Sequence, residues 1–269
     1  MTYRVVAFDL DGTLLDSRRR IRDDTLAALR EVREKGLKVI VVTGRHHVAA
    51  HAYHDLLGLE TPIICCNGAY VFDYAQAAVL AANPLKKDQA RALVALSRRH
   101  GLHNFVYTED AMTFEDENDH VKGLRVWAED LPARVKPTMR KVDNFEEVIE
   151  QALVIWKLVI SHPVTAVLDA GIAEMKRDVE VSYESSWHNR MDVAQLGNSK
   201  GGRLAEWVRG QGIEMADVIA FGDSDNDISM LTQAGVGVAM GNSVDEVKAC
   251  ANWVTSGNDG DGIAAALRR

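Results

Sequence analysis

The chain has 269 residues, of which 47% are apolar and 26% charged, and its formal net charge is −8. This is ordinary for a soluble globular protein of one large domain, or of a domain with an insertion. The acidic balance argues against a nucleic-acid partner, no stretch is apolar enough for a membrane span, and nothing implies a protein partner. Three cysteines make no disulfide framework and no leader pattern is present, so we expect a cytoplasmic protein.

The first third alternates short apolar runs with helical patterns. In chain order, the predicted elements are a strand at 3–9, a helix at 23–35, a strand at 37–43, a helix at 46–57 and a strand at 62–68. Continuous apolar strands separated by helices are typical of a parallel sheet with helices on both faces.

The last third repeats this alternation. The predicted elements are a helix at 199–209, a strand at 217–223, a helix at 227–235, an apolar run at 236–240 and a helical segment at 243–251. Ser243, followed three residues later by Glu246, is a capping-box signature for that last segment.

The middle of the chain has a different character. Its predicted elements are a helix at 86–100, strands at 104–110, 112–116, 154–161 and 179–186, and a helix starting at 164. These strands are more polar and contain aromatic residues, which favours an antiparallel sheet with one solvated face. We therefore predict an α/β core formed by residues 1–83 and 189–269, with an inserted α+β domain at 84–188.

Carboxylates follow two of the predicted core strands. Asp9 and Asp11 come directly after the first, and "GDSDND" at 222–227 ends the strand near 220. The carboxyl ends of parallel strands meet at one edge, so these groups should converge there and repel one another unless a cation is present. Mg²⁺ is the usual such ion beside phosphate. A calcium loop is the rival interpretation, but position twelve from Asp223 is Ala234 instead of the required Glu.

Groups that bind anions occur at the same edge. Lys200 lies in the first turn of a predicted helix, where phosphate is readily bound. Thr43 and the backbone amides of Leu10 and Gly44 can donate to further phosphoryl oxygens. Each piece alone is weak, since Asp-x-Asp is common in turns and a lone lysine is usually a surface charge. Together, at strand and helix ends, they indicate phosphoryl transfer.

The four pieces in this order resemble the four motifs of the haloacid dehalogenase superfamily: "DLDGT" (9–13), Thr43, Lys200 and "GDSDND". The inserted segment and "NGA" (67–69) resemble the Cof-type branch. The resemblance implies a Rossmannoid, doubly wound parallel core with an α+β cap of the C2B type. The pieces "TGRHHVA" (43–49), "ICCNG" (64–68), "SWH" (186–188), "GNSKG" (197–201) and "NDISML" (226–231) resemble the bacterial pyridoxal phosphate phosphatases of this branch.

The resemblance implies a role for each matching residue. Asp9 would be the nucleophile that forms an aspartyl-phosphate, and Asp11 the general acid and base. Asp9, the backbone carbonyl of Asp11 and Asp223 would hold Mg²⁺. Thr43, Lys200 and Asn226 would bind phosphoryl oxygens, and Asp227 would orient Lys200 or a metal-bound water.

Five further residues are candidates for substrate specificity: Arg45, His46, Asn67, Trp187 and His188. All but Asn67 also have a structural interpretation, such as a salt bridge for Arg45 or hinge packing for Trp187. The expected function is Mg²⁺-dependent hydrolysis of pyridoxal 5′-phosphate, a small-molecule phosphate ester. The alternatives are a broad sugar-phosphate phosphatase, a phosphomutase, or an inactive protein that binds phosphate esters.

Overall fold

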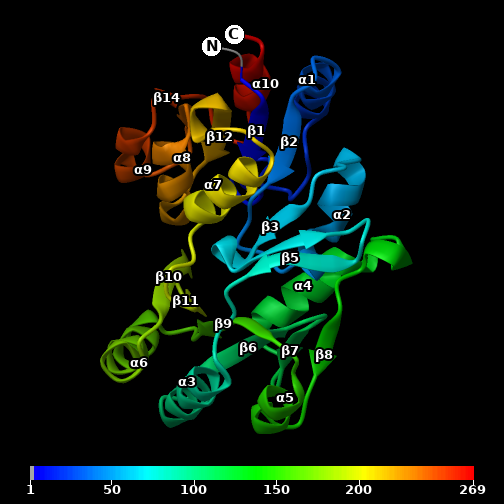
Figure 1. The fold of residues 1–269 in the computed structure, drawn as a ribbon. Coiled ribbons are helices and arrows are strands. Elements are labelled where there is room, and N and C mark those ends of the chain that lie inside the picture. The colour runs from blue at the N-terminus through cyan, green and yellow to red at the C-terminus, as the bar shows by residue number, and fades with distance from the viewer. Residues whose placement is uncertain (1–2) are drawn as a thin grey trace. The chain divides into compact units, whose positions relative to one another are not determined.

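The structure is a computed structural model that describes residues 3–269, without the side chains of residues 186 and 187. Its packing divides the chain into two units (Figure 1). The first, here the α/β unit, comprises Met1–Gly44, Leu57–Ala81 and Ser199–Arg269, and the second, the inserted unit, comprises Arg45–Leu56 and Ala82–Asn198. The domain limits expected from the sequence, with the insertion at 84–188, stay a prediction.

A five-stranded parallel sheet forms the centre of the α/β unit, as the sequence predicts. Its strands are β1 (Val5–Phe8), β2 (Lys38–Val41), β12 (Val218–Gly222), β13 (Val236–Ala239) and β14 (Trp253–Val254). The order is β14-β13-β12-β1-β2, and every neighbouring pair is parallel. The chain leaves β1 toward one edge and β12 toward the other, so β1 and β12 flank the topological switch point, where such sheets bind ligands.

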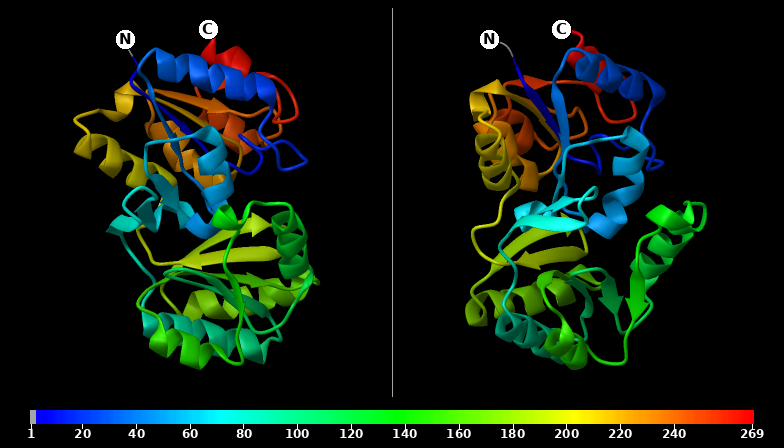
Figure 2. Two further views of the ribbon diagram at one scale, coloured as in Figure 1. Left: turned by 90° about the vertical axis from the view of Figure 1, so that its right-hand side faces the viewer. Right: turned by 45° about the vertical axis from the view of Figure 1, so that its right-hand side comes forward.

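Helices cover both faces of this sheet (Figure 2). They are α1 (Asp23–Glu34), α7 (Lys200–Gly210), α8 (Ile228–Gln233), α9 (Asp245–Cys250) and α10 (Gly262–Leu267), with 3-10 turns at Met215–Asp217 and Asp225–Asp227. α1 packs against α10 on one face, and α7, α8 and α9 lie on the other. Val5 and Ala7 of β1 bury against Leu204 of α7 and Met230 of α8. The doubly wound α/β fold is thereby confirmed.

The third predicted strand differs from expectation. β3 (Ile63–Cys65) is short and pairs antiparallel with β4 (Tyr70–Asp73), which lies beside β5 (Ala78–Ala82) in a separate three-stranded sheet. Its link to the parallel sheet is one bridge between Val42 and Ile64. The prediction of a full parallel strand was wrong because a 3-10 turn at Cys66–Gly68 reverses the chain after three strand residues.

The predicted capping box was also wrong. Helix α9 begins at Asp245 with Val244 at its N-cap, and no side-chain cap bond forms there. The backbone N–H of Ser243 donates instead to the carbonyl of Met240, 3.1 Å away. Ser243 therefore closes a turn and lies one residue before the N-cap position of α9.

The inserted unit is built on a six-stranded sheet of order β10-β11-β9-β6-β7-β8, antiparallel except for the pair β7 and β8. Its strands are β6 (His103–Thr108), β7 (Met112–Phe114), β8 (Met139–Lys141), β9 (Ile155–Ser161), β10 (Ser182–Trp187) and β11 (Arg190–Ala194). Its helices are α2 (His47–Leu57), α3 (Lys87–Arg99), α4 (Asp119–Glu129), α5 (Phe145–Gln151) and α6 (Thr165–Asp178), with a 3-10 turn at Ala133–Val135. Four of these elements were not predicted from the sequence, namely α4, β8, α5 and β11.

One hydrophobic cluster holds α3 and α6 against this sheet. Leu93 of α3 and Leu168 of α6 pack with Val106, Leu158 and Val193 of three neighbouring strands. At the two ends of the long inserted segment, Asn83 Nδ2 donates to Asn198 Oδ1, and Asn198 Nδ2 donates to the carbonyl of Asn83, each across 3.0 Å. Among residues 3–269, no helix has the length and apolar character needed to cross a bilayer.

Candidate active site

Asp9 and Asp223 lie at the switch point of the parallel sheet. Asp9 follows β1 directly, and its backbone N–H donates to the carbonyl of Phe221 across 3.0 Å. Phe8 and Phe221 are paired in register, and their rings stack with centroids 4.8 Å apart. The apolar strands thus fix the positions at which the two carboxylates emerge.

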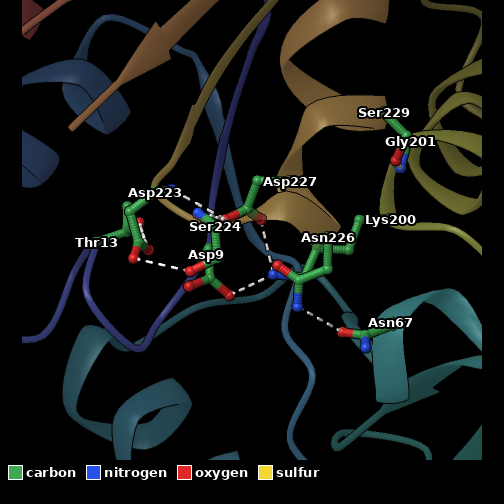
Figure 3. Close-up of polar contacts among 10 residues, drawn as sticks. All are labelled: Asp9, Thr13, Asn67, Lys200, Gly201, Asp223, Ser224, Asn226, Asp227 and Ser229. Carbon is green, nitrogen blue, oxygen red and sulfur yellow. Dashed lines mark hydrogen bonds and ion pairs between the residues drawn. The ribbon is translucent and has the colours of Figure 1, made fainter. Parts of the chain in front are cut away.

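Asp227 organises the loop after β12. Its side chain is fully buried, and Oδ2 accepts hydrogen bonds from the backbone N–H groups of Asp223 (2.9 Å) and Ser224 (3.1 Å) (Figure 3). A Cβ on Gly222 would lie 2.5 Å from the Cβ of Asp227, so this close approach requires glycine. Thr13 Oγ1 donates to Asp223 Oδ1 across 2.8 Å and orients that carboxylate.

Lys200 supplies a buried positive charge between two of these carboxylates. It is the first residue of α7, after the N-cap Ser199, whose hydroxyl accepts from the backbone N–H of Gly202. Only 1% of Lys200 is exposed, and its Nζ lies 2.6 Å from Asp9 Oδ1 and 2.7 Å from Asp227 Oδ1. A buried ion pair therefore joins the N-terminus of α7 to the carboxyl end of β1.

Three carboxylates at this place form a group that could hold a metal ion. One oxygen each from Asp9, Asp223 and Asp227 lies within 4.8 Å of the others. Gly12 (φ +84°) makes room for them, because a Cβ there would lie 2.4 Å from Asp223 Oδ2. A donor set made only of oxygens suits a hard divalent cation. Asp227 already accepts three hydrogen bonds, which favours an orienting role for it.

The electrostatics reflect this crowding. Burial raises the pKa of the Asp9 carboxyl well above its ordinary value; Lys200 opposes the rise, and the charges of Asp227, Asp223 and Asp11 add to it. Burial and the charge of Asp227 raise the pKa of Asp223 to about 6, against the hydrogen bond from Thr13. A bound cation would favour the ionised form of both groups.

The pKa of Lys200 shows the same balance from the other side. Burial by itself lowers the pKa of this amine, but the carboxylates of Asp227 and Asp9 outweigh burial and hold the pKa above its ordinary value. The amine therefore remains charged at neutral pH.

The remaining phosphate-binding candidates lie in the same unit. Leu10 is buried in the loop after Asp9, and Thr43, 1% exposed, follows β2. The backbone N–H of Asn67 donates to the carbonyl of Thr43 (3.1 Å), and Asn226 Nδ2 donates to Asn67 Oδ1 (3.1 Å). Gly44 lies against this pair, since a Cβ there would be 2.8 Å from Asn67 Oδ1.

Asp11 lies outside the group of three carboxylates. Its side chain is exposed, and its backbone forms an isolated bridge with Leu15. An exposed carboxyl beside a buried nucleophile can exchange protons with solvent, as a general acid and base must.

The other specificity candidates belong to the inserted unit. The Arg45 guanidinium lies over the rings of Tyr53 (5.1 Å) and Trp127 (5.3 Å) and donates to the carbonyl of Ala49. His188 is exposed in the turn between β10 and β11. The side chain of Trp187 lies outside the described part of the chain, so its expected role is not addressed by the structure.

His46 has partners for both of its ring nitrogens. Nε2 lies 2.8 Å from the carbonyl of Thr108, and Nδ1 accepts from the backbone N–H of Val48 at 3.2 Å. These contacts require a neutral ring with its proton on Nε2. Burial lowers the pKa of His46 to about 4, and the nearby charge of Lys157 adds to this shift.

Sequence reasoning did not single out Thr13, Gly12 or Ser224, although all three contact Asp223 or the loop around it. A buried threonine directly after a glycine in a strand-end loop was the available signal, since its hydroxyl needs an acceptor in the interior. The nearest acceptors at that edge are the carboxylates.

Comparison with known proteins identifies relatives along nearly the whole chain. A family model described as haloacid dehalogenase-like hydrolase matches residues 6–267. The chain is 44% identical over 264 residues to pyridoxal phosphate phosphatase YbhA of Escherichia coli (strain K12), covering 98% of this chain and 97% of that protein. It is 30% identical over 271 residues to 5-amino-6-(5-phospho-D-ribitylamino)uracil phosphatase YitU of Bacillus subtilis (strain 168), covering 98% and 96%.

A solved structure shares the fold along the whole chain. It is described as a haloacid dehalogenase-like hydrolase from B. subtilis, with a TM-score of 0.86, 26% identity and coverage of 99% of both chains. Because the family model spans nearly every residue, the chain belongs to the haloacid dehalogenase-like hydrolases.

Proposed function

We propose that the chain is a Mg²⁺-dependent phosphomonoesterase that hydrolyses pyridoxal 5′-phosphate through an aspartyl-phosphate on Asp9. The observation that carries the proposal is the burial of Asp9 between Lys200, 2.6 Å away, and the carboxylates of Asp223 and Asp227. A nucleophilic carboxylate needs neighbouring positive charge to approach a phosphate dianion. Lys200 supplies one such charge, and a cation among the three carboxylates would supply the other.

Asp9, Asp223 and the backbone carbonyl of Asp11 would hold the Mg²⁺, whose charge would stabilise the phosphoryl group as it is transferred. The oxygen-only donor set and the space left by Gly12 support this assignment. Asp227 would keep Lys200 and the loop in place, because its two oxygens already accept from Lys200, Asp223 and Ser224.

The reaction would use two carboxyl groups in turn. A carboxylate oxygen of Asp9 forms a bond to phosphorus while the ester P–O bond breaks, and protonated Asp11 gives its proton to the leaving alcohol oxygen. Asp11 then takes a proton from water, whose oxygen forms a bond to phosphorus while the bond between phosphorus and the Asp9 oxygen breaks. Inorganic phosphate is released and the Asp9 carboxylate is regenerated. Thr43, Lys200, Asn226 and the backbone amides of Leu10 and Gly44 would hold phosphoryl oxygens.

The substrate assignment is supported by YbhA, which is 44% identical along nearly the full length of both chains and is named for pyridoxal phosphate. A cytoplasmic location belongs to the same proposal. It is supported by Cys65 and Cys66, which are buried and not joined in a disulfide, as expected in a reducing compartment.

The test is phosphate release from pyridoxal phosphate, erythrose and hexose phosphates and nucleotides, with Mg²⁺ and with EDTA. We expect pyridoxal phosphate to have the highest kcat/KM, EDTA to abolish turnover and added Mg²⁺ to restore it. Asp9→Asn, which keeps the shape of the side chain and removes the nucleophile, should be inactive. Near-normal turnover by highly purified Asp9→Asn would overturn the mechanism, and a leading sugar phosphate would overturn the substrate.

A further inference from the structure

The chain at Cys66–Gly68 has an uncommon backbone that points one side chain into the site. Cys66, Asn67 and Gly68 have φ of +50°, +56° and +90°, so two consecutive non-glycine residues adopt the left-handed region. Such residues cost roughly 1–3 kcal/mol each unless their surroundings hold them. Asparagine tolerates this conformation better than most residues.

Contacts on both sides hold the turn in place. The backbone N–H of Asn67 donates to the carbonyl of Thr43 (3.1 Å), and Arg203 Nε donates to the carbonyl of Gly68 (2.8 Å). Gly68 also lies against the start of α7, where a Cβ would be 2.3 Å from the carbonyl oxygen of Ser199. The turn is thus fixed to β2 and to the helix that carries Lys200.

The result of this construction is a contact between two amides. Asn67 is 5% exposed, and its Oδ1 accepts from Asn226 Nδ2 across 3.1 Å (Figure 3). Gly44 leaves the room for it, because a Cβ there would lie 2.8 Å from Asn67 Oδ1 and 3.8 Å from Asn226 Nδ2. The left-handed turn, the contacts that hold it and the glycine at position 44 together permit this hydrogen bond.

We propose that Asn67 is a positioning residue that aims the second N–H of the Asn226 amide at the phosphoryl group. The inference rests on the proposed function, in which Asn226 binds phosphate. An amide NH₂ has two hydrogens, so one can be given to Asn67 Oδ1 while the other remains for an anion. Two carbonyl oxygens facing each other repel, so Asn67 Oδ1 excludes the flipped amide.

The flipped amide is the state that would impair the site. Without an acceptor at position 67, rotation of the Asn226 side chain by half a turn would present its oxygen to the phosphate. In the present orientation Asn226 Oδ1 is buried, and no described residue donates to it. The bond to Asn67 Oδ1 is therefore what favours this orientation, and its loss should weaken phosphate binding through Asn226 alone.

The test compares the effect of Asn226→Ala in three backgrounds: wild type, Asn67→Gly and Asn67→Asp. Glycine keeps the left-handed backbone and removes the acceptor, whereas aspartate keeps an acceptor oxygen in the same place. The quantities are kcat and KM for pyridoxal phosphate, and the Kd of inorganic phosphate with Mg²⁺ from calorimetry. Thermal unfolding of each variant shows whether it is folded.

We expect Asn226→Ala to lower kcat/KM by roughly tenfold or more in wild type and in Asn67→Asp, as for one charge-assisted hydrogen bond. In Asn67→Gly the same substitution should cost less than about threefold, because the amide is already misaligned. An equal cost in all three backgrounds would overturn the proposal. If Asn67→Gly does not fold, the comparison uses wild type and Asn67→Asp alone. A loss of kcat/KM on Asn226→Ala that is well below the wild-type loss in the Asn67→Asp background overturns the proposal, and an equal loss supports it.

The phosphate affinities separate this inference from the proposed function. If the wild type releases no phosphate from any ester, the proposed function falls, and the three-background comparison of phosphate Kd decides the role of Asn67. If the wild type neither turns over esters nor binds inorganic phosphate, both are overturned.

Discussion

Lys200 Nζ donates to Asp9 Oδ1 across 2.6 Å, in a place where neither side chain is more than 7% exposed. A second bond of 2.7 Å joins the same amine to Asp227. The lysine thereby compensates two carboxylates that the fold has removed from water, one of them the nucleophile of the proposed reaction. Its loss should affect stability and turnover together.

Replacing Lys200 with methionine should lower the free energy of unfolding by about 3–5 kcal/mol at pH 7, because one partner of a buried ion pair is removed. Turnover should fall at least about 100-fold, as when an electrostatic donor is removed from an active site. Urea unfolding and phosphate release measure the two effects.

The same replacement at an exposed lysine, Lys38→Met, is the matched control and should change both quantities little. The pH dependence adds a check. Without Lys200 the pKa of Asp9 rises further above its ordinary value of 3.8, so the variant should lose more stability than the wild type as the pH rises above that value. Equal unfolding free energies for Lys200→Met and the wild type at pH 7 would contradict the assignment.

Gly12 and Gly36 allow the backbone and the site to be tested separately. Both have positive φ, +84° and +88°, but a Cβ on Gly12 would lie 2.4 Å from Asp223 Oδ2, whereas at Gly36 nothing lies within 4 Å. Alanine at either position should destabilise the protein by about 1 kcal/mol or more through backbone strain. Only Gly12→Ala should also raise the Mg²⁺ concentration for half-maximal activity, by roughly tenfold.

Magnesium titrations of phosphate release on the two variants make the comparison. A similar Mg²⁺ requirement for Gly12→Ala and Gly36→Ala would show that the Asp223 carboxylate does not take part in metal binding. Thermal unfolding of both variants checks that the backbone effects are alike.

The convergence of the charged side chains at the site could be predicted from the sequence because it depends on where each residue stands relative to a strand or helix end. Asp9 and Asp223 each follow an apolar run, and Lys200 begins a helix, so strand-end and helix-end rules place them at one edge of the sheet. The short strand and the turn within residues 62–68 could not be predicted in this way. Cys66 has a left-handed φ, but cysteine is a residue type that is common in strands, so the sequence contains no signal for this conformation.

The elements of the inserted unit were harder to predict from the sequence, for another reason. Helix α4 begins in a polar stretch, and its N-cap Asn118 is recognisable mainly once the helix is known. Arg45 was considered as a substrate contact or a salt-bridge partner, and the structure adds a packing contact that was not predicted, with the guanidinium over the rings of Tyr53 and Trp127. Residue 127 is 82 positions away along the chain, and such long-range pairs are set by packing that a single sequence does not display.

His46 predicts how stability depends on pH. Its pKa in the folded state is about 4, below the ordinary value of 6.5, because burial disfavours the charged ring; the hydrogen bond to the carbonyl of Thr108 opposes this shift, and the charge of Lys157 adds to it. The unfolded state therefore binds more protons between these two values, and stability is full above pH 6.5 and falls as pH decreases toward 4. At pH 4.5 the expected loss is about 2–3 kcal/mol.

Urea unfolding at pH 7 and at pH 4.5, with wild type and His46→Gln, measures this contribution. Other groups also titrate over this range, so the informative quantity is the difference between the two proteins. His46→Gln cannot be protonated and should lose less stability on acidification by about that amount. The same pH dependence in both proteins would mean that the His46 ring has the same pKa in the folded and unfolded states.

Lys157 and Asp192 form a second buried ion pair, on β9 and β11 of the inserted unit. Their side chains are 3% and 7% exposed, and the Lys157 amine also lies 5.1 Å from the centre of the Tyr107 ring. Removing either residue takes away the ion-pair partner of a buried charge, so Asp192→Leu alone should cost about 3–5 kcal/mol of unfolding free energy.

Removing both charges should be much less harmful. In the double variant Lys157→Met with Asp192→Leu, no charge remains to be desolvated, and a thioether can pack against the Tyr107 ring where the amine lay. Its unfolding free energy should therefore lie within about 1 kcal/mol of the wild type. Urea unfolding of the wild type, the two single variants and the double variant measures the coupling between the positions. Single costs that simply add would mean that the pair supplies hydrogen bonds or shape to the sheet that apolar side chains cannot replace.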